Sequence, residues 1–361
     1  MNERMHGGER YGKKIRYDFS VNVNPLGLPQ AVQEVLRRGA AHWDRYPDPQ
    51  CSELTAAIAG YHGIPSEWIC CGNGAAELIW QLVRERMPGC AGIMEPTFSE
   101  YRSALESVGC RVRTIALSEA DGFMVPMEEL MYAASGTDMM FLCNPNNPTG
   151  RLLRLDSLRQ LADTCRRANV TLVLDECFLP FLAEEKECSA ISLLGENPHL
   201  IVIRAFTKIY AMAGLRLGYA LCSEAGLWDR VWKQNPPWSV SLPAQEAGVA
   251  ALRQTEYLER TKAFLRRERP YLAKGLSKLG MTVYPGEANF ILFSMPGEPE
   301  PGWLYRRMLE EEILIRDCMN FAGLGAGYYR IAVRTEAENQ YILDKMEGRI
   351  RNESVSFDSG G

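Results

Sequence analysis

The sequence predicts an α/β protein, with a large and mostly parallel sheet covered by helices on both faces and a small α+β domain after it. Between residues 68 and 220, short apolar segments alternate with helical segments, as in parallel strands joined by crossover helices. Beyond residue 281 the strands are shorter. We therefore expect an N-terminal arm and first helix (1–40) that pack with the small domain, a large domain (41–250), a small C-terminal domain (251–350) and a flexible tail (351–361).

Composition limits the possible partners and the compartment. The 361 residues are 46% hydrophobic and 24% charged, with a net charge of −5. Without a long basic run, nucleic acid and membrane surfaces are not expected partners, and no apolar stretch approaches the ~20 residues of a membrane span. The polar start is unlike a signal peptide, and the eleven scattered cysteines contain no C-x-x-C pair. We expect a cytoplasmic protein with reduced thiols and no metal site.

The first segment of the chain predicts an irregular arm followed by two short helices. The arm includes His6 and a stretch rich in Asn and Pro, which contains Asn24. Such residues favour hydrogen-bonded loops over regular structure. Helices are predicted over 30–38 and near 51–60, and Tyr46 lies in a proline-fixed turn between them, where it could simply be a packing residue.

A possible phosphate-binding turn follows. The strand that begins near residue 68 leads through a Gly-Asn-Gly turn into a helix that begins near Gly74, Ala75 and Ala76. Small residues at a helix start leave its first amide groups accessible at the positive end of the helix dipole, although the same residues also form ordinary turns. The next strand, at 91–95, is followed by Phe98, which could stack on a flat ring or belong to the core.

Two further strands end in polar residues. The strand at 139–143 stops at the loop Asn-Pro-Asn-Asn-Pro-Thr-Gly, and turn formers of this kind define a sharp loop. After a helix at about 155–168, an apolar strand ends at Asp175 and Glu176. Desolvating a carboxylate is costly unless it has a partner, so Asp175 either caps local structure or pairs with a cationic ligand such as a pyridinium N–H.

The stretch from 200 to 219 contains the strongest candidate for chemistry. A buried strand at 200–203 is followed by Arg204, Thr207 and Lys208, and ligands of open α/β sheets bind at the carboxyl ends of strands. Lys208 can form a Schiff base with an aldehyde cofactor, while Thr207 and Arg216 can hold a phosphate dianion. The alternative is a surface lysine on a loop.

Three arginines of the small domain are candidates for binding an anionic substrate. A long helical region at 243–276 precedes strands near 281–284, 289–293, 313–316 and 328–333 and helices near 302–311 and 336–349. Arg330 and Arg334 are separated by an even number of residues, which predicts one strand face, and Arg316 lies on another strand. One guanidinium can bind a carboxylate and another a phosphate, with His6 and Asn24 as helpers. Arg316 and Arg334 could instead be surface ion-pair residues.

The loop at 144–150, Asp175-Glu176 and the Thr207-Lys208 segment with Arg216 together resemble the fold-type I pyridoxal-phosphate enzymes, over about residues 16–349. The resemblance implies that Lys208 carries pyridoxal 5'-phosphate as an internal aldimine, with Asp175 on the pyridine nitrogen and Asn147 on the ring hydroxyl. It also implies a homodimer with shared active sites. The remaining implied roles are ring stacking by Phe98, phosphate binding by Gly74, Ala75, Ala76, Thr207 and Arg216, substrate carboxylate binding by Arg330, and contact of Tyr46 with the cofactor phosphate of the neighbouring subunit.

Within that superfamily the chain is similar to the threonine-phosphate decarboxylases, which make the aminopropanol phosphate linker of cobalamin. Segments 6–8, 18–27, 238–240 and 315–334 carry this similarity. It implies conversion of L-threonine O-3-phosphate to (R)-1-aminopropan-2-yl phosphate and CO2. The alternative is a histidinol-phosphate or aromatic aminotransferase that uses 2-oxoglutarate; such enzymes usually have Tyr where this chain has Phe178, and Gly where it has Arg334. A non-catalytic use of the fold is disfavoured, because Lys208, Asp175, Asn147 and Arg216 are all present.

Overall fold

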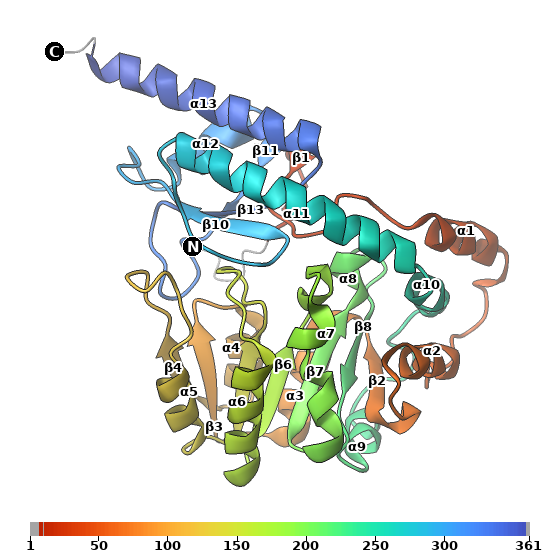
Figure 1. Ribbon diagram of the computed structural model, residues 1–361. Coiled ribbons are helices and arrows are strands. Elements are labelled where there is room, and N and C mark those ends of the chain that lie inside the picture. Colours follow the sequence, from red (N-terminus) through yellow and green to blue (C-terminus); the bar gives the residue numbers. More distant parts are fainter. Residues whose placement is uncertain (1–6, 10, 359–361) are drawn as a thin grey trace.

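The computed structural model describes residues 7–9 and 11–358, with side chains to residue 351, and its large domain contains a seven-stranded sheet (Figure 1). The strand order is β2-β8-β7-β6-β5-β3-β4, and all neighbours are parallel except for β8, which is antiparallel to both β2 and β7. The fold class predicted from the sequence is confirmed. The strands are β2 (Ile69–Gly72), β3 (Cys90–Glu95), β4 (Arg111–Ala116), β5 (Met139–Cys143), β6 (Thr171–Asp175), β7 (Leu200–Ala205) and β8 (Gly218–Leu221).

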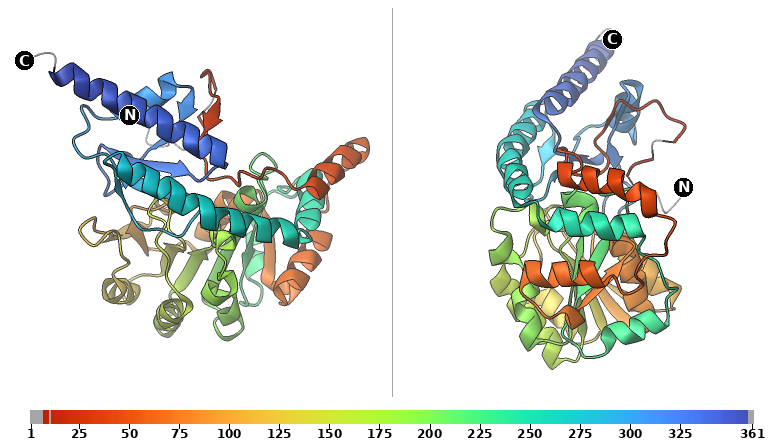
Figure 2. Two further views of the ribbon diagram at one scale, coloured as in Figure 1. Left: turned by 45° about the horizontal axis from the view of Figure 1, so that its top comes forward. Right: turned by 90° about the vertical axis from the view of Figure 1, so that its right-hand side faces the viewer.

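Helices cover both faces of this sheet (Figure 2), which explains why β5, β6 and β7 are mostly apolar and are buried along their whole length. Alternate residues of β6 belong to different cores: Leu172 and Leu174 pack in one apolar cluster, and Val173 in the other. Helices α3 (Gly74–Arg86), α4 (Glu100–Ser107) and α9 (Leu227–Lys233) contribute to the second cluster, while α2 (Ser52–His62), α5 (Met127–Ala134), α6 (Leu155–Arg167) and α10 (Leu242–Leu252) contribute to the first.

The small domain is built on a four-stranded antiparallel sheet that lies above the large sheet in Figure 1. Its order is β12-β13-β10-β9, and three helices accompany it. The elements are α11 (Thr255–Lys278), β9 (Thr282–Val283), β10 (Phe290–Ser294), α12 (Trp303–Glu310), β11 (Ile313–Leu314), β12 (Arg316–Asp317), β13 (Tyr328–Ala332) and α13 (Glu336–Asp358). The helical region predicted at 243–276 is two helices, α10 and α11, and α13 continues to Asp358 although the sequence predicted its end near 349.

The N-terminal arm runs along the junction between the two sheets. Its strand β1 (Tyr17–Asp18) pairs in parallel with β11 of the small domain. Helix α1 (Gln30–Gly39) instead packs against α10. The arm therefore contacts both parts of the molecule before the chain enters the large sheet. No helix in the part of the chain that the structure describes combines the length and the apolar character needed to cross a membrane.

Candidate active site

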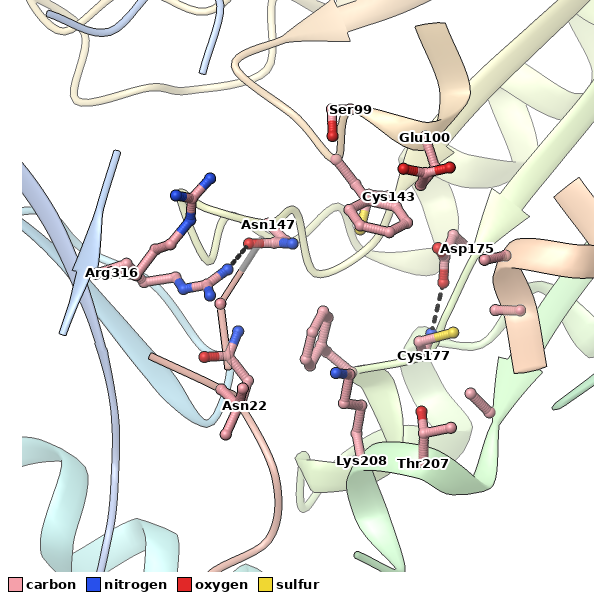
Figure 3. A pocket seen from close by; sticks show the side chains of 18 of the residues that line it. Asn22, Ser99, Glu100, Cys143, Asn147, Asp175, Cys177, Thr207, Lys208 and Arg316 are labelled. Atoms are coloured by element: carbon pink, nitrogen blue, oxygen red, sulfur yellow. Dashed lines mark hydrogen bonds between the residues drawn. The ribbon is translucent and has the colours of Figure 1, made fainter. Parts of the chain in front are cut away.

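A cavity of about 340 Å³ lies at the carboxyl ends of β5, β6 and β7, and Arg316 of the small domain forms part of its wall (Figure 3). Parallel strands bring their carboxyl ends to one edge of the sheet, so loops that are far apart in sequence meet there. The arm contributes Ser20 and Asn22 to the wall. Ten residues predicted from the sequence also line it: Ala75, Ala76, Phe98, Asn147, Asp175, Thr207, Lys208, Arg216, Arg316 and Arg330.

Lys208 lies on the short helix α8 (Phe206–Ile209), which begins directly after β7. Its side chain faces the cavity opposite Asp175. Burial of the amine, together with the positive charges of Arg330 and Arg216, lowers the pKa of Lys208 to about 8. A larger fraction of the amine is therefore neutral near physiological pH, which is the nucleophilic form needed to attack an aldehyde.

Asp175 ends β6 and is almost completely buried, with 5% of its surface exposed. One carboxylate oxygen, Oδ1, accepts the backbone N–H of Cys177 at 3.0 Å, and Oδ2 accepts the phenol of Tyr101 at 2.6 Å. No cation forms an ion pair with it among the residues that the structure describes. A buried carboxylate that faces a cavity without a cation is suited to a cationic N–H donor from a ligand.

The first turn of α3 lies beside Arg216, an arrangement that suits an anionic ligand. The first amide groups of a helix have no carbonyl partner within it, and Ala75 and Ala76 place two of them at the cavity. Gly74 has a φ of +81°, and a Cβ there would lie 2.6 Å from Nη2 of Arg216. A Cβ on Gly218 would lie 2.7 Å from the backbone nitrogen of Ala75. These two glycines therefore allow a guanidinium and strand β8 to approach the helix start.

Two arginines of the small domain form the opposite wall. Arg316 on β12 and Arg330 on β13 are direct cross-strand partners, and both are buried. Arg330 donates to Oδ1 of Asn147 and to the carbonyl oxygen of Ser20 (2.8 Å), while its Nε is buried without a partner. Burial lowers the pKa of Arg330 to about 10. Among the described residues no carboxylate neutralises Arg330, so its guanidinium is available to an anionic ligand.

The sequence of the chain also matches a known protein family. Residues 14–346 match the family model "Aminotransferase class I and II". The chain belongs to that family. It is accordingly a pyridoxal-phosphate enzyme, and the wall of the cavity carries the residue types that this cofactor needs. The family resemblance, the fold and the cofactor predicted from the sequence are confirmed.

Relatives in this family have two different activities. The chain is 41% identical to threonine-phosphate decarboxylase of Salmonella typhimurium, over 90% of this chain and 89% of that protein. It resembles the crystal structure of histidinol-phosphate aminotransferase from Clostridium acetobutylicum with a TM-score of 0.87 and 28% identity, over 93% of this chain and 99% of that one. The structure of L-threonine-O-3-phosphate decarboxylase from Porphyromonas gingivalis matches with a TM-score of 0.82 and 26% identity, over 92% and 99% of the two chains.

The residues present fit the cofactor on structural grounds. Asp175 offers an unneutralised carboxylate, Lys208 an amine of lowered pKa, and the start of α3 with Arg216 a phosphate cradle. Thr207 and Phe98 line the same cavity. The individual roles remain predictions. Within the described residues, no group of three or more His, Cys, Asp or Glu side chains could hold a metal ion.

Two residues predicted to help bind substrate do not line the cavity. Arg334 donates to the carbonyl oxygen of Asp18 (3.1 Å) and pairs with Glu338 (2.8 Å). The even spacing from Arg330 failed as a guide because β13 ends at Ala332, so strand alternation does not reach residue 334. The side chain of Asn24 donates to the carbonyl oxygen of Ile209 and to the hydroxyl of Thr261, both at 2.8 Å. Asn24 therefore binds the segment that follows Lys208.

Tyr46, which is predicted to contact the cofactor phosphate of the neighbouring subunit, lies at the surface of this chain. Tyr46 is 80% exposed, packs against Trp238 with ring centroids 4.8 Å apart and the rings tilted by 35°, and does not line the cavity of its own chain. His6 lies outside the described residues. Two residues of the site were not predicted from the sequence: Tyr101, which contacts Asp175, and Asn22, which lines the cavity. Asn22 lies two residues before Asn24 in the same Asn-rich stretch, and this was the only signal for it.

Proposed function

We propose that the protein decarboxylates an O-phospho amino acid, L-threonine O-3-phosphate, to (R)-1-aminopropan-2-yl phosphate and CO2. The observation that carries the proposal is the pair of neighbouring buried arginines, Arg316 and Arg330, in the cavity that contains Lys208. Such a pair suits a substrate with two anionic groups, a carboxylate and a phosphate. The 41% identity to a threonine-phosphate decarboxylase supports the same substrate.

The side chains of the cavity have different expected roles in this reaction. When bound, the cofactor supplies an electron sink for the bond that breaks at the substrate Cα. Arg330 and Arg316 orient the substrate, and the energy of binding the phosphate is available to hold the carboxylate out of the ring plane. Lys208 lines the same cavity, and we expect its Nζ to deliver the proton that replaces CO2 at Cα.

The alternative function is transamination of histidinol phosphate. The structure of a histidinol-phosphate aminotransferase matches this chain with a TM-score of 0.87. Phe178 favours the decarboxylase. It lines the cavity with an apolar ring, packed edge-on against Phe290 with centroids 5.1 Å apart, and offers no hydroxyl group to the cofactor. Many aminotransferases of this group have Tyr where this chain has Phe178.

The decisive experiment compares two substrates with the reconstituted enzyme. L-threonine O-3-phosphate should release CO2 and an amino-alcohol phosphate, without consumption of 2-oxoglutarate. L-threonine should be poorer in kcat/KM by at least the ~1.5–3 kcal/mol of one charge-assisted contact, because it lacks the phosphate that the arginines bind. The opposite result would be glutamate formed from 2-oxoglutarate and histidinol phosphate, with no CO2 from threonine phosphate. That result would assign the aminotransferase activity instead.

We also propose that the active unit is a cytoplasmic homodimer in which Tyr46 completes the cofactor site of the partner. Its exposed ring, beside the half-exposed Trp238, supports a role outside its own cavity. All eleven cysteines are free, which suits a reducing compartment. Light scattering should give twice the mass of one chain, and Tyr46→Ala should weaken cofactor binding while circular dichroism stays unchanged. A fully active monomer would refute the shared site.

A further inference from the structure

Tyr101 is a fully buried phenol on α4 that reaches the end of β6 from another part of the chain. Its hydroxyl donates to Oδ2 of Asp175 at 2.6 Å, a short distance typical of a hydrogen bond to a carboxylate. Because Oδ1 of Asp175 is already held by the backbone N–H of Cys177, the two bonds together fix both oxygens of the carboxylate. The orientation of Asp175 therefore depends on Tyr101.

The ring of Tyr101 has a second set of contacts that hold it in place. It stacks on Phe141 of β5 with centroids 5.1 Å apart and an interplanar angle of 13°. Its edge meets Phe98, with centroids 5.6 Å apart and an angle of 84°. Phe98 lines the cavity, where it is predicted to cover the cofactor ring. Tyr101 thus contacts both the side chain predicted for the ring face and the carboxylate predicted for the ring nitrogen.

The hydroxyl remains a donor at all relevant pH values. Burial, followed by the negative charge of Asp175, raises the pKa of Tyr101 well above its ordinary value. A hydrogen bond donated to a carboxylate stabilises its ionised form over its protonated form. Loss of this donor would leave Oδ2 of Asp175 without the hydrogen bond that fixes its direction, so the carboxylate would be less well aimed at a ligand nitrogen.

We propose that Tyr101 is a positioning residue that keeps the Asp175 carboxylate aimed at the cofactor nitrogen, and so sets how strongly the carboxylate holds that nitrogen protonated. The inference deepens the proposed function but rests on cofactor binding alone. It holds for decarboxylation and for transamination alike. Its test can therefore fail or succeed independently of which substrate the enzyme uses.

Tyr101→Phe removes the hydroxyl and keeps the ring that packs on Phe141 and Phe98. With cofactor labelled with nitrogen-15 in the ring, the NMR signal of the substrate-free enzyme should move toward that of an unprotonated nitrogen. In turnover assays we expect kcat to fall about tenfold, the effect of one charge-assisted hydrogen bond, with little change in KM. A purely structural role would lower stability without moving the nitrogen signal.

Tyr329→Phe is the matched control. Tyr329 is also fully buried and donates its hydroxyl to a carboxylate, that of Glu298, and it does not line the cavity. It should lose comparable stability and leave the nitrogen-15 signal in place. Tyr101→His, which retains a ring N–H donor, should recover part of the wild-type signal and kcat. If both Tyr101 variants keep the wild-type nitrogen signal and kcat, the proposal is overturned.

Discussion

Lys208→Ala is expected to lose the yellow absorption band of the bound cofactor and to lower the rate by about 10²–10⁴-fold. Two functions of the amine disappear together. The imine to the cofactor requires this primary amine, and proton transfer by a positioned side chain contributes a factor of that size by itself. Absorption spectra of the reconstituted protein and single-turnover assays measure the two losses separately.

Lys208→Arg serves as the control for charge, since it keeps a cation and removes the primary amine. It should behave like the alanine variant, whereas Lys186→Ala, at an exposed lysine on α7 (Glu185–Cys188), should behave like wild type. The lowered pKa adds a test in the wild type. Because the amine is neutral above about pH 8, attachment of cofactor to the apoenzyme should accelerate as pH rises, with its midpoint near pH 8 rather than 10.5. A colourless wild type in excess cofactor would contradict the assignment of Lys208.

Asp175→Asn is expected to keep the fold and some cofactor while lowering kcat by about 10²–10³-fold, the usual size of losing one preorganised electrostatic contact. A neutral amide cannot stabilise a protonated pyridine nitrogen, so the electron sink weakens. In the variant the amide oxygen can still accept the backbone N–H of Cys177, and the amide NH2 can donate to the phenol oxygen of Tyr101, which is why we expect the fold to be kept. Steady-state kinetics and thermal unfolding check these two expectations.

Asp138→Asn is a matched control for that experiment. Asp138 precedes β5 and accepts the backbone N–H groups of Gly89 and Cys90, both at 2.9 Å, at the opposite end of the sheet from the cavity. The same chemical change there should leave the absorption band and the rate unaltered. If Asp175→Asn proved as active as wild type, another group would have to protonate the ring.

The parts of the site that could be predicted from the sequence are those that follow strands. Asp175 and Lys208 follow apolar strands that are adjacent and parallel, and the topology of such sheets brings their carboxyl ends together. The loop at 144–150 and the start of α3 were recognisable because Gly, Asn and Pro define turns whatever the rest of the chain does. Local chemistry and sheet topology therefore predicted the cofactor side of the cavity.

Contacts between side chains of different elements could not be predicted in this way. Tyr101 precedes Asp175 by 74 residues, and nothing in the sequence indicates which buried phenol meets which carboxylate. Arg204 was expected with Lys208 at the strand end. It lies within β7, buried and paired with Glu176 (2.7 Å) and Glu185 (2.6 Å). The strand extended two residues beyond its apolar run because these carboxylates compensate the charge.

The placement of the two arginines on β12 and β13 has an evolutionary consequence. The two arginines proposed to bind a substrate's anions belong to the small domain, while Lys208 and Asp175 belong to the large domain. Mutations in the small domain can change which metabolite is accepted without disturbing the machinery that activates it. The fold itself is shared with a decarboxylase and an aminotransferase, whose structures match this chain with TM-scores of 0.82 and 0.87. New activities in such a lineage can arise by exchanging the recognition module over an unchanged reactive centre.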